Sequence, residues 1–244
     1  MLLLMANSAL GSVHEIAPLP TDQWPPLPQH TNQIAVAKVL AEYQDESLDW
    51  RIYTRVGPYT PLGDYLNWSV AQSNGAASQR GATDSAGVTM ISYDNRATFV
   101  YNPVTIAQSA LWHHSHHVKG NPLDPRFWAN VDKLIAMQRE DGAIPVPSTW
   151  TYRGATHTNW ISGMAQGQST SAMLRAYQLS SDPRYFLAAS NSMRFMLQDH
   201  PVGGMGHLGD LHPSLQHYPM IREYPYEPDS YVLDGSVIAL LSVL

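Results

Sequence analysis

The chain has 244 residues, a formal net charge of −6 at pH 7 and no cysteine. The lack of cysteine excludes disulfides, thiolate metal sites and cysteine nucleophiles, and the negative charge excludes bulk electrostatic attraction to nucleic acid or another polyanion. Charged residues make up only 14% of the chain, whereas it holds 7 tryptophans and 13 tyrosines. This balance suits a protein that handles neutral or weakly charged rings, and an anionic ligand would depend on a few local cations.

Residues 1–94 are expected to form a leader followed by a region of short strands. The apolar start, residues 1–6, is interpreted either as a clipped signal peptide or as a frayed beginning of the fold. The compartment therefore stays open, with a secreted or periplasmic protein slightly favoured. No stretch approaches the ~20 apolar residues that a membrane helix needs. The remaining expectations are an extended proline-rich leader over 13–30, a short helix over 34–43, and short strands with ordered loops over 48–98.

From Asn102 onward the pattern is helical. Pro103 stands where a first-turn proline is tolerated, and apolar residues then recur with helical spacing to Leu111. Further helices are expected over 124–138, 162–179, 182–197 and from about 228 to 244. The last of these carries no capping glycine and no basic last turn, so we expect the chain to stop inside a domain.

The helices are joined alternately by short turns and by long connections rich in glycine and aromatic residues, over 141–161 and 201–227. This pattern favours a mainly α fold in which residues 95–244 form a partial (α/α) toroid, preceded by the short β- and loop-rich region. In such rings the long loops at one end line a groove for polymeric sugar. A plain helical bundle or solenoid is the alternative.

Five blocks occur in a specific order along the helical part. Together they resemble the C-terminal domain of the D-glucuronyl C5-epimerases, the enzymes that modify heparan sulfate and heparosan. One block alone is unspecific, because Asp-Gly-x-x-Pro recurs in many toroids, but the ordered set is specific. The resemblance covers roughly residues 87–244, and its blocks are Tyr101–Gln108, Gln138–Pro145, Trp160–Gln168, Ala172–Tyr177 and residues 223–235.

The resemblance implies an epimerase that inverts C5 of D-glucuronate to L-iduronate in a glycosaminoglycan-like polysaccharide, with no organic cofactor. The expected partner is a uronate-containing polysaccharide, a nucleic-acid partner and a membrane span are not expected from the charge and the apolar runs, and a homodimer stays open. The family's active-site Glu-Tyr pair falls on Glu223 and Tyr224, while two further family tyrosines would lie past residue 244. We therefore expect this chain alone to be inactive or nearly so. Asp234 stands where the family has asparagine, and a carboxylate there would repel an anionic substrate.

The residues themselves are consistent with that chemistry. Inversion at C5 needs a base and an acid on opposite faces of the ring, and it needs the charge that builds on the carboxylate to be offset. Glu223 and Tyr224 point to opposite sides of an extended segment, so Glu223 would orient a neighbour while Tyr224 reaches the sugar. Arg222 would lower the pKa of Tyr224. The alternative for Tyr224 is an ordinary packed aromatic residue.

Candidate substrate-binding residues lie on two segments. The amides of Gln166 and Gln168 can donate to and accept from sugar hydroxyls, although the small residues around them equally favour tight helix packing. The loop after Pro147 offers a stacking face and a cation, the alternative being solvent-facing loop residues. We expect Glu223, Tyr224, Gln166 and the loop 149–153 to share one concave face. The complete substrate-binding set is Thr149, Tyr152, Arg153, Gln166, Gln168, Arg222 and Asp234.

A group of histidines at residues 113, 114, 116 and 117 is expected to lie partly exposed on a helix. No carboxylate stands beside the group at ligand spacing, so no metal site is expected there, nor a calcium site on the acidic residues 45–49. Two rival functions remain open. One is a uronate polysaccharide lyase or unsaturated-uronide hydrolase on the same toroid, and the other is a non-catalytic sugar-binding fragment.

Overall fold

The computed structural model of the chain describes residues 81–93, 98–152, 154–199, 202–208, 213–225 and 232–242. The chain divides into two compact units, and every described residue belongs to the second unit, Val56–Val243. The expectations for the leader, for a helix at 34–43 and for strands before residue 81 fall outside the described residues. The expected domain boundary after residue 94 also lies in a segment, 94–97, that is not described.

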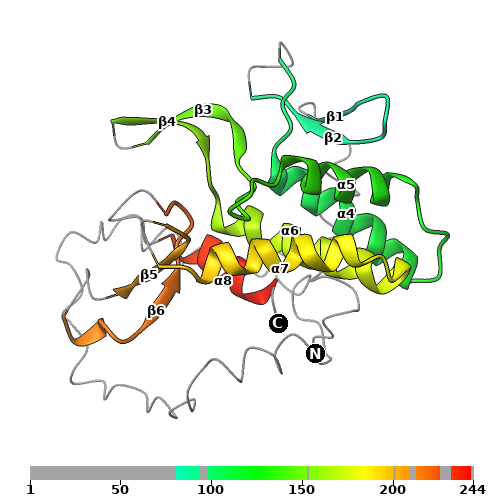
Figure 1. The fold of residues 1–244 in the computed structure, drawn as a ribbon. Coiled ribbons are helices and arrows are strands. Elements are labelled where there is room, and N and C mark those ends of the chain that lie inside the picture. The colour runs from blue at the N-terminus through cyan, green and yellow to red at the C-terminus, as the bar shows by residue number, and fades with distance from the viewer. Residues whose placement is uncertain are drawn as a thin grey trace, which may run out of the picture. The chain divides into compact units, whose positions relative to one another are not determined.

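The described part of the chain is rich in helix, as the sequence predicts, and carries small antiparallel two-stranded sheets (Figure 1). Strands β1 (Gly81–Thr83) and β2 (Thr89–Ile91) lie in the region expected to hold short strands. The helices are α4 (Pro103–Val118), α5 (Arg126–Met137), α6 (Gly163–Ser180), α7 (Pro183–Leu197) and α8 (Leu233–Leu241), with a 3-10 turn, η4, at Pro213–Leu215. The strand pairs are β1 (Gly81–Thr83) with β2 (Thr89–Ile91), β3 (Val146–Tyr152) with β4 (Ala155–Trp160), and β5 (Met205–His207) with β6 (Pro219–Ile221).

Side-chain caps start three of these helices where the sequence predicts them. The Asn102 side chain accepts a hydrogen bond from the Val104 amide at 2.8 Å, and the Asp182 side chain accepts one from the Arg184 amide at 3.0 Å. Proline follows each of these caps, where its fixed φ and missing N–H cost nothing. Ser162 caps α6 in the same way. The expected start of the last helix near residue 228 lies outside the described residues, and α8 begins at Leu233.

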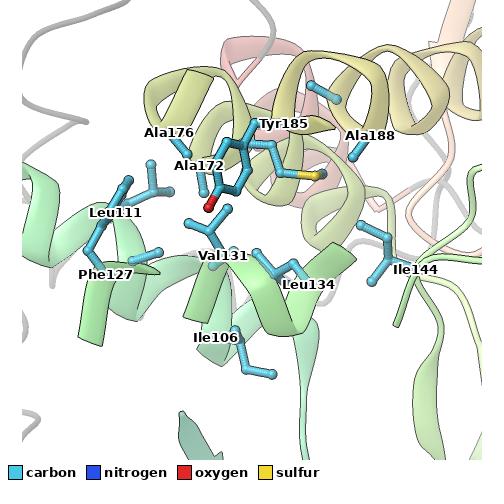
Figure 2. Packing of buried hydrophobic residues seen from close by; sticks show 14 of the residues in the cluster. Ile106, Leu111, Phe127, Val131, Leu134, Ile144, Ala172, Ala176, Tyr185 and Ala188 are labelled. Atoms are coloured by element: carbon cyan, nitrogen blue, oxygen red, sulfur yellow. The ribbon is translucent and has the colours of Figure 1, made fainter. Parts of the chain in front are cut away.

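Four helices enclose the main hydrophobic core. Side chains from α4, α5, α6 and α7 point toward one another in it, as Figure 2 shows for Leu111, Phe127 and Tyr185. Leu111 and Phe127 are 0% exposed, and burying a side chain of this size contributes about 1.5–3 kcal/mol. The core is therefore the rigid base from which the connections project.

Short and long connections alternate along the helices, as expected. Only Ser181 and Asp182 separate α6 from α7, and Ser181 adopts a left-handed φ of 58° to close that turn. The long connections carry β3–β4 and β5–β6. The interpretation of residues 141–161 as an aromatic-rich loop was wrong in one respect, because most of that segment is a regular β-hairpin whose strands project from the helices (Figure 1).

The histidines of α4 differ from expectation. His113 and His114 are only 4% and 3% exposed, so the expected partial exposure is wrong for both. His113 Nδ1 lies 3.6 Å from Asp124 Oδ2, and burial lowers the pKa of His113 to about 4. Within the described residues, no three histidine or acidic side chains gather in a way that could hold a metal ion. Among the described residues, every helix is too short or too polar to span a lipid bilayer.

Two glycines of α6 let other segments approach its backbone. A Cβ at Gly167 would lie 2.6 Å from the Ala239 Cα of α8, and a Cβ at Gly163 would lie 2.5 Å from the Arg222 carbonyl oxygen. Both distances are too short for any side chain. The small residues at the start of α6 therefore serve close packing of α8 and of the segment after β6.

We predict that Gly167→Ala destabilises the protein by about 1–3 kcal/mol, the usual cost of overpacking, because the added methyl group forces α8 away from α6. Thermal or urea unfolding measures the change. Gly204→Ala is the matched control, since a Cβ there would meet its nearest neighbour at an ordinary 3.4 Å. Equal stability of the two variants would show that α8 is not closely docked on α6.

Candidate functional site

The two long connections meet at the N-terminus of α6, where Glu223 forms the contact. One of its carboxylate oxygens accepts a hydrogen bond from Ser162 Oγ at 2.5 Å, and the other accepts one from the Met164 amide at 2.7 Å. Its backbone carbonyl accepts a third from the Gly163 amide at 2.9 Å. The first amides of a helix have no partner within the helix and favour negative charge. Glu223 thus caps α6 from 61 residues away in the sequence.

Glu223 is almost completely buried, with 4% of its surface exposed. Burial, with a smaller contribution from the charge of Asp234, raises the pKa of Glu223 from the usual 4.5 to about 7, against the opposing effect of the Ser162 and Met164 hydrogen bonds. A carboxyl group that titrates near neutral pH can both hold and release a proton under physiological conditions, as a general acid or base must. The site therefore contains one group with this property.

Tyr224, the next residue, lies among the aromatic rings of the β3–β4 hairpin. Its ring centroid is 4.6 Å from that of Trp150 and 6.0 Å from that of Trp160. All three residues are partly buried, so part of each meets solvent. The expectation that Glu223 and Tyr224 point in different directions agrees with this placement: Glu223 faces the helix N-terminus and Tyr224 faces the hairpin.

The first turn of α8 lies against Glu223. A Cβ at Gly235 would be 2.4 Å from Glu223 Oε2, so only glycine allows this approach. Asp234 is exposed, and its carboxylate accepts a hydrogen bond from the Gly235 amide at 2.9 Å. Asp234 therefore lies at the edge of the site, where its charge acts on Glu223.

Arg222 is buried, with 7% of its surface exposed, and its side chain crosses Gly206 of β5. A Cβ at Gly206 would lie only 2.1 Å from Arg222 Nε. The Arg222 amide donates a hydrogen bond to the Gly204 carbonyl at 2.8 Å. These contacts fasten the segment before Glu223 to the β5–β6 hairpin.

Gln166 and Gln168, in the first turns of α6, are fully buried. The Gln166 side chain accepts a hydrogen bond from the Ile144 amide at 2.5 Å and donates to the Gly142 carbonyl and to Ser192 Oγ. Its amide therefore ties α6 to α7 and to the preceding turn, and does not face Tyr224. The Gln168 amide is also enclosed, with no hydrogen-bond partner among the described residues.

The remaining expected substrate-binding residues lie on the β3–β4 hairpin. Thr149 is exposed, and its Oγ1 is 3.3 Å from Thr158 Oγ1 on the neighbouring strand. Tyr152 ends β3, but its side chain and the whole of Arg153 fall outside the described residues. The structure thus brings Glu223, Tyr224 and the hairpin together and leaves the Gln166 amide elsewhere.

Sequence reasoning did not assign Ser162 or Trp160 to the site, although both stand in the block at residues 160–168. Ser162 carries a readable signal, because serine before a helix start is a common N-cap. Its second role, as a hydrogen-bond donor to Glu223, has no local signal. The alternating threonine and aromatic residues on both sides of Gly154 are typical of a hairpin, but strict alternation would place Trp160 on the threonine face, so Trp160 carries no such signal.

Comparison with known proteins supports one family. Residues 140–244 match the family model of the D-glucuronyl C5-epimerase C-terminus. A D-glucuronyl C5-epimerase of Caenorhabditis elegans is 28% identical over 120 residues, which are 48% of this chain and 18% of the relative. The match thus spans less than a fifth of that relative's length. The resemblance seen in the sequence is confirmed over residues 140–244, whereas the block at 101–108 precedes the matched segment.

We predict that Glu223 makes stability depend on pH. An acid whose pKa is higher in the folded state holds its proton there while the unfolded chain has lost it, so stability falls as pH rises through the interval between the two pKa values. For Glu223 that interval runs from 4.5 to about 7, with a slope of about 1.4 kcal/mol per pH unit. Urea unfolding between pH 4.5 and 7.5 should show this slope in the wild type and a flatter one in Glu223→Gln.

Glu140→Gln, which removes an exposed carboxylate, serves as the control and should leave the slope unchanged. Parallel stability curves for the wild type and Glu223→Gln would contradict the raised pKa.

Proposed function

Because residues 140–244 match the C-terminal part of the D-glucuronyl C5-epimerases, we propose that the chain is part of a carbohydrate epimerase. The proposed reaction inverts C5 of a D-glucuronate unit to L-iduronate within a glycosaminoglycan-like polysaccharide. The observation that carries the proposal is the pair at the N-terminus of α6. The buried carboxyl group of Glu223, with a pKa near 7, stands next to the partly exposed Tyr224, whose ring packs on Trp150 of the β3–β4 hairpin.

In the proposed mechanism Tyr224 transfers the proton at C5. Removal of this proton leaves an enediolate on the uronate carboxyl group, and a second acid returns a proton to the opposite face of the ring. Tyr224 is better placed than Glu223 to meet a sugar, because both Glu223 oxygens are held by α6 while the tyrosine is partly exposed. Glu223 holds the segment that carries Tyr224 in place. Because Glu223 gains or loses its charge near neutral pH, its ionisation changes the basicity of Tyr224.

The proposed substrate contacts come from the hairpin and from the edge of α8. Thr149, Tyr152 and Arg153 would bind the polymer, with Arg153 providing positive charge for the carboxylate. Buried Gln166, Gln168 and Arg222 would act on the site by holding its backbone. We also propose that residues 95–244 form part of an (α/α) toroid, preceded by the region 1–94. The alternating short and long connections support this arrangement.

Two rival functions are tested by the products. A lyase or an unsaturated-uronide hydrolase on the same scaffold shares the first proton removal, but a lyase then expels the C4 substituent and leaves an ultraviolet-absorbing unsaturated sugar. An epimerase incorporates solvent deuterium at C5 without cleaving the chain. A sugar-binding fragment does neither. Incubation of the enzyme from the complete reading frame with heparosan in D₂O therefore separates the three.

We predict that Tyr224→Phe in the enzyme from the complete reading frame lowers the rate at saturating substrate by about 10²–10⁴-fold, the usual contribution of a general acid–base group. The substitution removes only a hydroxyl, so the melting temperature should stay unchanged. Tyr177→Phe is the matched control, since that ring packs on Phe186 at 5.3 Å within the helical layer. A loss below about tenfold would make Tyr224 a hydrogen-bonding contact and Glu223 the better candidate base.

We predict that Asp234→Asn lowers KM for a uronate polymer by about two- to fivefold, which corresponds to an exposed charge interaction of ~0.4–1 kcal/mol. The same change removes a negative charge near Glu223, so the pKa of Glu223 falls and the acidic limb of the rate profile moves to lower pH. Steady-state kinetics across pH 5–8 measure both effects. An unchanged KM together with an unchanged profile would remove Asp234 from the site.

A further inference from the structure

The β3–β4 hairpin has two chemically different faces. Threonines pair across the strands on one face, with the Oγ1 atoms of Thr151 and Thr156 3.2 Å apart. On the other face Trp150 pairs with His157, and their ring centroids are 6.3 Å apart. Successive residues of a strand point to opposite faces, so this alternation is the ordinary result of the pleat.

Trp160 breaks the alternation. Strict alternation would put its side chain on the face of Thr158, two residues earlier, yet its ring centroid is 5.2 Å from that of Trp150. The residue between them, Asn159, adopts a left-handed backbone with φ of 53°, and the register shifts between Val146 and Thr149 on the opposite strand. The reversal at Asn159 and this bulge together turn Trp160 to the aromatic face.

The Trp160 ring is also fixed in orientation. Its indole N–H donates a hydrogen bond to Ser148 Oγ at 3.3 Å, and Ser148 lies within the bulge. Asparagine adopts the left-handed region more readily than most non-glycine residues, so its presence at position 159 suits this conformation. The result of the reversal is two tryptophans side by side next to Tyr224.

Trp150 and Trp160 together form an aromatic surface, called the platform below, whose chemistry favours an uncharged partner. The indole side chains of Trp150 and Trp160 carry no formal charge, so they offer a stacking surface and no ion-pair partner. The C–H groups on one face of a pyranose ring form an apolar surface that packs well on aromatic rings, whereas a carboxylate gains nothing from an indole face. The platform is continuous with Tyr224, so a sugar on it would adjoin the sugar at Tyr224.

From this geometry we infer that Trp150 and Trp160 form a stacking subsite for an uncharged pyranose unit, and that Asn159 builds the subsite by turning Trp160 onto the face of Trp150. That this unit neighbours a reacting uronate rests on the proposed function, whereas the stacking itself does not. Asn159 is a positioning residue in this scheme, because it acts through Trp160.

The test measures binding of a neutral trisaccharide, cellotriose, and an acidic one, trigalacturonate, by saturation-transfer NMR titration of the intact chain. We expect cellotriose to bind, and Trp150→Ala to weaken its binding by about tenfold or more. Thr156→Val, on the threonine face, should bind as the wild type does. No signal from cellotriose, equal binding by Trp150→Ala, or a Trp150-dependent preference for trigalacturonate would each overturn the subsite.

A pair of substitutions at one position tests Asn159. Glycine adopts a positive φ without strain, so Asn159→Gly should keep cellotriose affinity within about twofold. Valine resists that conformation, so Asn159→Val should lose about tenfold while its melting curve stays cooperative. Equal affinity of the two variants would refute the role of Asn159. Deuterium exchange into heparosan, followed separately with the enzyme from the complete reading frame, fails if the epimerase proposal is wrong, while cellotriose binding then still reports on the subsite.

Discussion

The arrangement of the site depends on how the N-terminus of α6 is capped. The first amides of a helix have no partners within the helix, and here the Glu223 carboxylate, which is distant in sequence, accepts a hydrogen bond from the Met164 amide. Because Glu223 meets Ser162, Gly163 and Met164 at once, the segment that carries it has little freedom. Tyr224 is consequently held against the hairpin, and α8 must present a glycine where it passes the carboxylate.

This cap stabilises the helix with a group that burial makes expensive to ionise. A carboxylate at a helix N-terminus would usually have a low pKa, but loss of solvent outweighs the hydrogen bonds here and the pKa of Glu223 rises to about 7. Where a group is held in an electrostatically unfavourable state, function is a common reason. The same residue thus connects the packing of the long connections to the chemistry proposed for Tyr224.

The helices were predictable and the site was only partly so, for physical reasons. Asn102, Ser162 and Asp182 cap helices through contacts within a few residues, so their signals are local. The Glu223 cap joins residues far apart in sequence. The turn of Trp160 onto the face of Trp150 follows from the backbone angle at Asn159, which no sequence pattern specifies. The burial of His113 and His114 was missed because histidine suggests a polar surface, whereas their neighbours on α4 place them against the core. The family resemblance supplied the Glu-Tyr pair that the composition alone did not indicate.

The tip of the β3–β4 hairpin has an evolutionary consequence. Gly154 turns with a φ of 85°, and nothing lies within 4 Å of where its Cβ would stand. Residues inserted at such a tip add little loop-closure entropy and displace no neighbour. Proteins that evolve from this one could therefore acquire a longer β3–β4 hairpin, or different residues at its tip, without disturbing the helical core. Polymer preference and fold stability would then be separate traits, free to diverge at different rates.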